Sequence, residues 1–188
     1  KRILGMTGEE ILSIFYDNIV YKKNKYGWSF KEDLSFFKAK ILNFDLLDSK
    51  SGKILVSKGT KINQKIINDL KKKKISNVTI NEESLIGLFI SSDIIDEKTG
   101  KIYFEAGYEI DEVFLKFLND EKISKIDILK SDNIEIGSYI RNTLQADKAR
   151  SREEALFEIF KILRPGEPPT IETAETLFNN LFFNQDRY

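Results

Sequence analysis

The sequence predicts an α+β fold in which helical segments flank a central part built from two tandem β-β-α-β repeats. The first observation is an internal duplication, which aligns residues 45–80 with residues 93–128 without a gap. The second is a set of capping boxes and helical apolar periodicity before and after the duplication. The third is a change of basic residues: residues 1–136 hold 22 lysines and one arginine, whereas residues 137–188 hold two lysines and five arginines.

The composition excludes several classes of site. The 188 residues include no cysteine and no histidine, so cysteine nucleophiles, Cys/His zinc sites and Ser-His-Asp triads are ruled out. An enzyme here would depend on carboxylates, lysine, tyrosine or a hard cation. The absence of cysteine suits a reducing compartment. No apolar run approaches the roughly 20 residues that a membrane-spanning helix needs, and the first residues predict no signal peptide.

The charge and the first residue give two further expectations. The 30 basic and 30 acidic residues give a formal net charge of zero. We therefore expect the isolated chain to bind DNA weakly, because non-specific affinity comes mainly from counterion release. The missing initiator methionine indicates a piece of a longer protein.

The first elements are a helix and a hairpin. Thr7 and Glu10 form a capping box, and apolar residues follow at helical spacing. The segments Ile19–Tyr21 and Tyr26–Ser29 predict a hairpin around Lys22–Lys25.

Each copy of the duplication predicts a strand, an Asp/Ser/Lys/Gly turn, a second strand, a helix and a closing strand. Asn63 and Asp111 lie at the expected N-cap positions of the two helices. The predicted second strands are Lys53–Ser57 and Lys101–Glu105, and the closing strands are Ser76–Ile80 and Ser124–Ile128. The copies share core and turn residues rather than polar side chains suited to chemistry, which favours a structural or docking module.

The last part predicts three helices. The first covers roughly 135–144, and Ser151 begins a second helix with a capping box. This helix must end at Arg164, because Pro165 cannot continue it, and a stiff, extended loop is expected up to Pro169. Thr170 then caps a helix through about Phe182.

The segment Arg164-Pro165-Gly166-Glu167-Pro168-Pro169-Thr170, with the apolar residues that follow it, resembles a signature of the bacterial DNA-directed RNA polymerase β subunit. The opening Gly5–Leu12 and the closing Asp186-Arg187-Tyr188 resemble the same family. The resemblance implies that residues 1–18 and 137–188 are two segments of the lobe domain. It also implies that residues 19–136, with repeats at about 39–80 and 87–128, are a lineage-specific insertion.

The resemblance implies a non-catalytic fragment of a nucleotidyltransferase. The lobe would form part of the wall that encloses DNA, and the insertion would be a docking surface for sigma or regulators. The fragment alone would have no activity and no cofactor, since the family's Mg²⁺ site lies in another subunit. The implied partners are the other polymerase subunits, the sigma factor, promoter and downstream DNA, and regulators at the insertion. The implied location is cytoplasmic, with no membrane partner.

Arg164 is the first candidate for DNA contact, because it matches by motif position a family arginine that approaches the non-template strand. The alternative is a helix C-terminal cation that bonds the last carbonyls. A local basic cluster is a second candidate, with solvated helix ends and ion pairs to Glu153 or Glu154 as the alternative. The cluster consists of Arg141, Lys148, Arg150 and Arg152. Arg152 lies at a helix N-terminus, where its charge needs a compensating partner.

Three other groups have two interpretations each. The run Lys71–Lys74 could contact phosphates, although a solvated helix end is the simpler interpretation. Paired aspartates in the two turns could hold a hard cation, or they could cap the turns; they are Asp45, Asp48, Asp93 and Asp96. Four aromatic residues could form a docking patch, or they could pack the insertion onto the lobe; they are Trp28, Phe30, Phe36 and Phe37.

Two rival functions remain open from the sequence. One is a free-standing, duplicated protein-interaction module with no catalytic activity. The other is a carboxylate-metal enzyme, which the absence of a convergent acid cluster disfavours.

Overall fold

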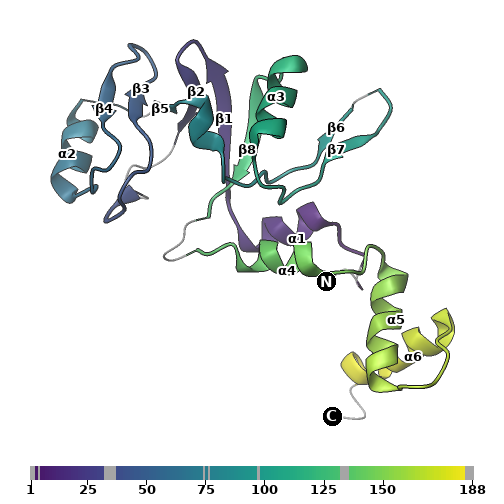
Figure 1. The fold of residues 1–188 in the computed structure, drawn as a ribbon. Coiled ribbons are helices and arrows are strands. Elements are labelled where there is room, and N and C mark those ends of the chain that lie inside the picture. Colours follow the sequence, from purple (N-terminus) through teal and green to yellow (C-terminus); the bar gives the residue numbers. More distant parts are fainter. Residues whose placement is uncertain are drawn as a thin grey trace. The chain divides into compact units, whose positions relative to one another are not determined.

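The computed structural model describes residues 3, 5–31, 37–73, 75, 77–96, 98–131 and 136–184. They belong to two compact units. The helical unit comprises Lys1–Phe15 and Ser138–Tyr188, and the repeat unit comprises Tyr16–Gly137. The predicted α+β fold is confirmed, since helices and an antiparallel sheet are both present (Figure 1).

The repeat unit is built on one antiparallel sheet in the order β4-β3-β5-β2-β1-β8, and β6 and β7 form a separate pair. These strands are β1 (Asn18–Asn24), β2 (Gly27–Lys31), β3 (Leu46–Asp48), β4 (Ile54–Val56), β5 (Asn77–Ile80), β6 (Ile94–Ile95), β7 (Ile102–Phe104) and β8 (Lys125–Leu129). The hairpin β1–β2 lies between the copies, because β2 pairs with β5 and β1 pairs with β8 (Figure 1).

The predicted hairpin is confirmed, but its turn lies further along the chain than expected. Asn24 pairs with Gly27, so the turn consists of Lys25 and Tyr26 rather than Lys22–Lys25. Asn24 Oδ1 accepts a hydrogen bond from the Tyr26 N–H at 2.8 Å. This local side-chain bond is typical of Asn in turns, and it fixes where the strand reverses.

The duplication reappears in the backbone hydrogen bonds. The Gly52 N–H donates to the Asp48 carbonyl at 2.8 Å, and the Gly100 N–H donates to the Asp96 carbonyl at 2.8 Å. Both helices begin as predicted. In α2 (Gln64–Lys72) the Asn63 side chain accepts from the Ile66 N–H, and in α3 (Glu112–Asp120) the Asp111 side chain accepts from the Phe114 N–H.

The two copies nevertheless differ in strand pairing. In the first copy β3 pairs with β5, so that Leu47 lies opposite Thr79 and is only 8% exposed. In the second copy Ile90, which precedes β6, bridges to Ile128, and β6 pairs with β7. Ile95, the counterpart of Leu47, is consequently 48% exposed. The duplicated sequence therefore supports two different arrangements of its first hairpin.

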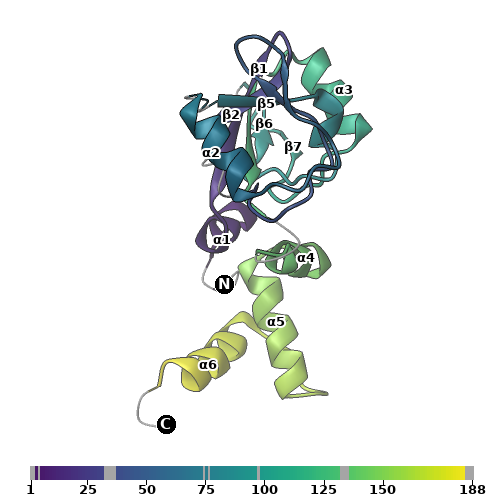
Figure 2. The same cartoon turned by 90° about the vertical axis from the view of Figure 1, so that its left-hand side faces the viewer.

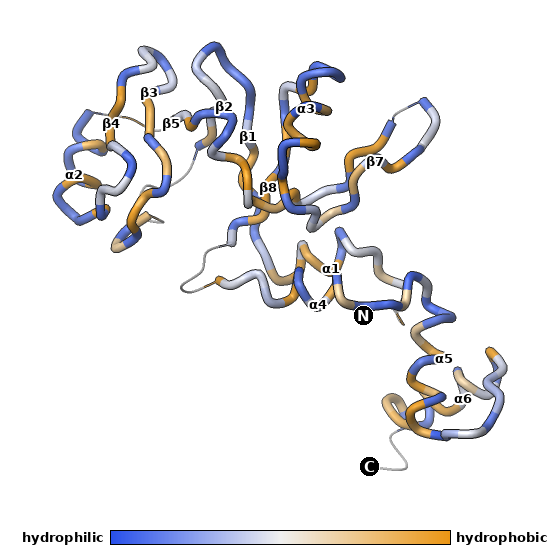
Figure 3. Tube along the Cα trace, viewed as in Figure 1, coloured by the Kyte–Doolittle hydropathy of each residue, from blue (hydrophilic) through white to orange (hydrophobic). Residues whose placement is uncertain are grey.

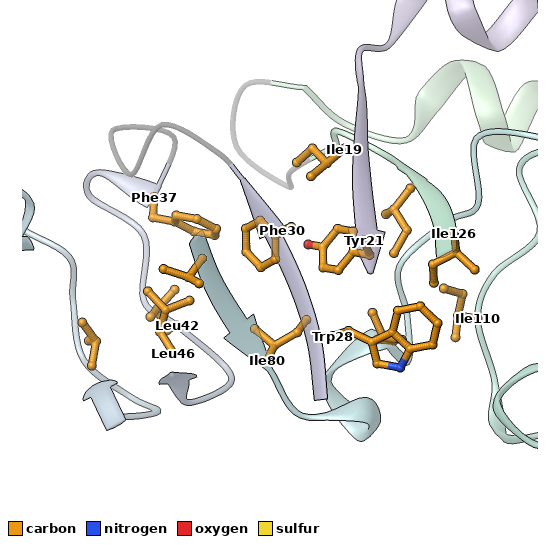
Figure 4. Packing of buried hydrophobic residues seen from close by; sticks show 14 of the residues in the cluster. Ile19, Tyr21, Trp28, Phe30, Phe37, Leu42, Leu46, Ile80, Ile110 and Ile126 are labelled. Carbon is orange, nitrogen blue, oxygen red and sulfur yellow. The ribbon is translucent and has the colours of Figure 1, made fainter. Parts of the chain in front are cut away.

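One apolar core fills the repeat unit (Figure 4). Trp28, Phe30 and Phe37 are buried in it, and Figure 4 shows Trp28 beside Ile126 and Ile110. The interpretation of these residues as an exposed docking patch is therefore wrong for all three, which pack within the repeat unit. Trp28 and Phe30 alternate inward on β2. Residues of α2 and α3 belong to the same core, and α2 contributes only a short apolar stripe (Figure 3). Phe36 lies outside the described residues.

The linker between the copies contains a short 3₁₀-helix, η3 (Glu82–Leu85). Polar contacts attach η3 to β1 and to α3. The Glu82 carboxylate forms an ion pair with Lys23 Nζ at 3.0 Å and accepts from Asn119 Nδ2 at 2.5 Å. Partial burial raises the pKa of Glu82, but the hydrogen bonds from Asn119 and Lys23 outweigh it, so the net pKa is lowered. The carboxylate thus joins β1, η3 and α3.

Ala39 has an unfavourable conformation that the second copy avoids. Its φ is 67°, a left-handed value, and Gly87 with φ 86° occupies the equivalent position. We expect Ala39→Gly to raise the free energy of unfolding by about 0.5–1 kcal/mol and Gly87→Ala to lower it by about 1 kcal/mol. Urea unfolding followed by the fluorescence of Trp28, the only tryptophan, measures both. Shifts of the same sign in the two variants would contradict this explanation.

The helical unit contains α1 (Gly8–Phe15), α4 (Tyr139–Ala146), α5 (Arg152–Leu163) and α6 (Ile171–Phe182). The first capping box is confirmed, because the Thr7 N–H donates to Glu10 Oε2 at 2.7 Å and the Glu10 N–H donates to Thr7 Oγ1 at 3.1 Å. The helix expected over 135–144 begins later, at Tyr139, and residue 135 lies outside the described residues. α5 and α6 pack together around Leu156, Phe160 and Ala174 (Figures 1 and 2).

Candidate nucleic-acid interface

The candidate residues lie around α5, whose two ends follow from local sequence. At the start, Ser151 Oγ accepts from the Glu154 N–H at 3.2 Å, as the capping box predicts. The Glu154 carboxylate, however, accepts from the Arg150 N–H at 2.6 Å. At the other end the Arg164 N–H donates to the Phe160 carbonyl at 2.8 Å, and Pro165 cannot continue the pattern. The predicted end of the helix at Arg164 is confirmed.

A turn follows the helix where the sequence predicted an extended loop. The Glu167 N–H donates to the Arg164 carbonyl at 3.3 Å, and Gly166 has φ 92°. Proline followed by glycine with positive φ is the signature of a type II turn. The expectation of a fully extended segment is therefore wrong for residues 164–167, because glycine allows the chain to reverse at once.

Arg164 projects from this turn into solvent. Its Nη1 atom lies 3.3 Å from Glu167 Oε2, and the two side chains are 53% and 58% exposed. An exposed ion pair of this kind contributes little to stability. The guanidinium can therefore exchange the carboxylate for another anion, such as a phosphate, at small cost. The planar donor fork of arginine suits that exchange.

Arg152 has a different environment. Its Nε donates to the Ile3 carbonyl at 2.9 Å, and its Nη1 forms an ion pair with Glu175 of α6 at 2.5 Å. Glu175 supplies the compensating partner that a cation at a helix N-terminus needs. Sequence analysis missed Glu175, since a separation of 23 residues carries no local signal. The guanidinium thus joins the N-terminal segment, α5 and α6.

The other basic candidates lie before α5. Arg141 is on α4, where its Nη1 donates to Asn142 Oδ1 at 3.2 Å, and Lys148 and Arg150 lie in the connection to α5. Lys148 lines a hollow of about 430 Å³ together with Asp147 and Glu158, so its charge lies among acidic groups there.

The five candidates do not form one patch. Arg164 follows the C-terminal end of α5, whereas Arg150 and Arg152 lie at its N-terminal end. A helix of this length separates them by roughly 18 Å, at 1.5 Å per residue. Two separate points of positive charge are therefore available on the helical unit.

The paired aspartates cap turns. Asp48 accepts from the Ser51 hydroxyl at 2.5 Å and from the Lys50 N–H at 3.3 Å, and these hydrogen bonds lower its pKa. In the second copy, hydrogen bonds from the Thr99 hydroxyl and the Lys98 N–H lower the pKa of Asp96. Asp45 and Asp93 accept the N–H groups of residues 58 and 106. Within the described ranges, no group of three or more acidic side chains gathers around a possible metal position.

The run Lys71–Lys74 lies at the C-terminal end of α2. Lys71 and Lys72 occupy its last turn, Lys73 is the C-cap, and all three are exposed. Cations there interact favourably with the helix dipole, so Lys71, Lys72 and Lys73 fit the interpretation of an exposed helix end. Lys74 lies outside the described residues.

The comparison with known proteins covers almost the whole chain. The β subunit of DNA-directed RNA polymerase from Rhizobium rhizogenes is 42% identical over 185 residues, and that from Bartonella tribocorum is 46% identical over 185 residues. Each match includes 98% of the chain. The chain is therefore related to a segment of the RNA polymerase β subunit. No protein-family model matches the sequence.

The resemblance of residues 164–183 to the β subunit is thus confirmed, and the match must also include the repeat unit, since so little of the chain is left out. The chain spans 13% of the length of these β subunits. No helix in the described part of the chain is both long and apolar enough to cross a bilayer.

Proposed function

We propose that the chain is a non-catalytic part of an RNA polymerase β subunit, in which the helical unit contributes to the wall around DNA. The observation that carries this proposal is the match of 98% of the chain to β subunits. The exposed Arg164, held by one solvent-exposed carboxylate, is the side chain best suited to contact the nucleic acid.

Among the other basic residues, Arg141, Lys148 and Arg150 would add positive potential near the start of α5. Arg152 would act indirectly, by holding α5 against α6 through Glu175. The indirect role of Arg152 follows from its own contacts, since its guanidinium already binds the Ile3 carbonyl and Glu175. A side chain that already uses its donors within the unit gains less from a phosphate.

The repeat unit would be an insertion that carries a docking surface for sigma or for regulators. Its first and last residues lie side by side, since the Tyr16 hydroxyl donates to the Gly137 carbonyl at 2.9 Å and the Lys130 N–H donates to the Asp17 carbonyl at 2.8 Å. A unit whose ends are adjacent can be inserted into a host domain with little distortion of that domain.

Replacement of Arg164 tests the DNA contact. In an assembled polymerase, Arg164→Ala is expected to shorten the lifetime of the promoter complex about fivefold, which corresponds to roughly 1 kcal/mol, the typical value of a lost hydrogen bond. Competitor-challenge assays of preformed complexes measure this lifetime. The circular dichroism of the variant chain should be unchanged, because the Arg164–Glu167 pair is exposed.

The matched control is Lys161→Ala, which removes a cation from the last turn of the same helix. Lys161 is paired with Glu158 at 3.3 Å and is 57% exposed, so its environment resembles that of Arg164. Equal lifetimes for wild type and Arg164→Ala would remove Arg164 from the DNA contacts. Equal shortening by both variants would indicate a general effect of charge instead of a contact.

A further inference from the structure

The outer face of the central sheet carries three lysines from three different elements. Alternation along β1 and β2 places Lys22 and Lys31 outward, while Tyr21 and Phe30 point into the core. On β8, Lys125 lies outward beside the buried Ile126. We call Lys22, Lys31 and Lys125, together with Asn77, the lysine face. These side chains line a shallow hollow of about 470 Å³.

The strand register brings like charges together on the lysine face. Lys22 lies directly opposite Lys125 in the antiparallel pair of β1 and β8. Like charges in directly opposed positions destabilise a sheet. On β2, Lys31 lies opposite Asn77 of β5, whose carboxamide can donate hydrogen bonds. The opposed lysines therefore repel each other when no anion is bound, and a bound anion would relieve this repulsion.

In the part of the chain that the structure describes, carboxylates neutralise the lysine face only slightly. Lys125 Nζ lies 4.0 Å from Asp127 Oδ2, at the limit of an ion pair. Among the described residues, neither Lys22 nor Lys31 has a carboxylate partner. All three lysines are exposed. Three exposed lysines thus line one hollow, and among the described residues two of them have no carboxylate partner.

The two copies of the duplication carry opposite net charges. Residues 45–80 contain nine lysines and three acidic residues, whereas residues 93–128 contain five lysines and ten acidic residues. The net charge of zero therefore conceals a basic copy and an acidic copy. Although β8 with Lys125 belongs to the acidic copy, β2, which also bears the lysine face, pairs directly with β5 of the basic copy. A polyanion that approaches from that side meets an attractive field.

We propose that the lysine face binds the phosphate backbone of duplex DNA. Lysine is depleted in protein–protein interfaces, and among the described residues of this face Val20 is the one exposed large hydrophobic side chain, at 37% exposure. No exposed aromatic side chain of these residues offers a stacking surface for single-stranded bases. The inference deepens the proposed function, because it gives the repeat unit its own contact with the nucleic acid of the polymerase.

The test is direct binding of the 188-residue chain to a short fluorescein-labelled DNA duplex, followed by anisotropy at low salt. The triple variant Lys22→Gln, Lys31→Gln, Lys125→Gln is expected to bind roughly tenfold more weakly. The slope of log K against log salt should become shallower by about two to three, since each phosphate contact contributes about 0.9. Binding by the wild-type chain should remain weak at physiological salt, as the zero net charge predicts.

The matched control is Lys98→Gln, Lys101→Gln, Lys116→Gln, which removes the same charge from exposed lysines of the acidic copy. This control should bind DNA like the wild type. Equal weakening by both triple variants, no weakening by the first, or no binding of duplex DNA by the wild-type chain would overturn the proposal. Preferential binding of polyglutamate would also overturn it, in favour of an acidic protein partner. Arg164 is unchanged in these chains. The duplex-binding test can therefore fail while the promoter-complex test of Arg164 succeeds, and it can succeed while that test fails.

Discussion

Replacement of Trp28 with alanine is expected to lower the free energy of unfolding of the repeat unit by about 3–5 kcal/mol. Trp28 is 0% exposed and lies in the core between the strands of both copies (Figure 4). Its removal takes away a large apolar side chain and leaves a cavity that the surrounding strands can fill only in part. Hydrogen exchange of the β1 and β2 amides measures the effect in this unit alone.

Tyr103→Ala provides the control, because Tyr103 is an aromatic residue of the same unit that is 41% exposed. Its loss should cost about 1 kcal/mol. If Trp28→Ala leaves no protected amides in β1 and β2, Trp28→Phe gives the graded measurement, with an expected loss of about 1–2 kcal/mol. A loss below about 1 kcal/mol for Trp28→Ala would show that Trp28 is not the centre of the core.

Gly27→Ala is expected to have the second largest effect, a loss of roughly 3 kcal/mol or more from backbone strain and overpacking together. Gly27 has φ 137°, and an added Cβ would lie 2.2 Å from the Ile80 carbonyl oxygen. This oxygen belongs to the backbone of β5, so the clash can be relieved only by a shift of one strand against the other. Urea unfolding followed by Trp28 fluorescence reports the change.

Gly59→Ala separates strain from close packing. Gly59 also has a positive φ of 82°, but no atom lies within 4 Å of the position of an added Cβ. We expect a loss of about 1 kcal/mol from the backbone conformation alone. Similar losses for Gly27→Ala and Gly59→Ala would show that β2 and β5 approach each other less closely than the structure indicates.

The helix starts and the duplication were predictable because their signals are local. A side chain such as Asn63 or Asp111 caps the helix that follows within three residues. The glycines of the two turns report a backbone conformation that few other residues adopt. These short-range constraints were sufficient to predict the helices and strands of both repeats and the end of α5 before Pro165.

The strand neighbours were not predictable, because they depend on contacts between distant residues. Nothing near Trp28 shows that β2 will pair with β5 or that β1 will pair with β8. The sequence alone therefore could not show whether Phe30 and Phe37 are buried in the core or form an exposed patch. The same limit applies to the two arrangements of β3 and β6, whose sequences are almost equivalent.

The candidate DNA contacts were predictable only as a set of basic residues. The sequence identified both Arg164 and Arg152 as candidates, but their partners differ. Glu167 lies three residues from Arg164, a spacing that sequence reasoning could have used, whereas Glu175 is brought to Arg152 by the packing of α6. The lysine face was missed because its members meet only through the register of β1, β2 and β8.

The pairing of β1 with β8 has a consequence for synthesis of the chain on the ribosome. Asn18 pairs with Leu129, so one edge of β1 has no partner until more than a hundred further residues have been made. At a typical rate of 5–20 residues per second, this interval is roughly 5–20 s. During that time the nascent hairpin presents an open strand edge, which is the kind of surface that pairs with other chains. Outward-pointing lysines on β1 and β2 would then keep neighbouring nascent chains apart until β8 arrives.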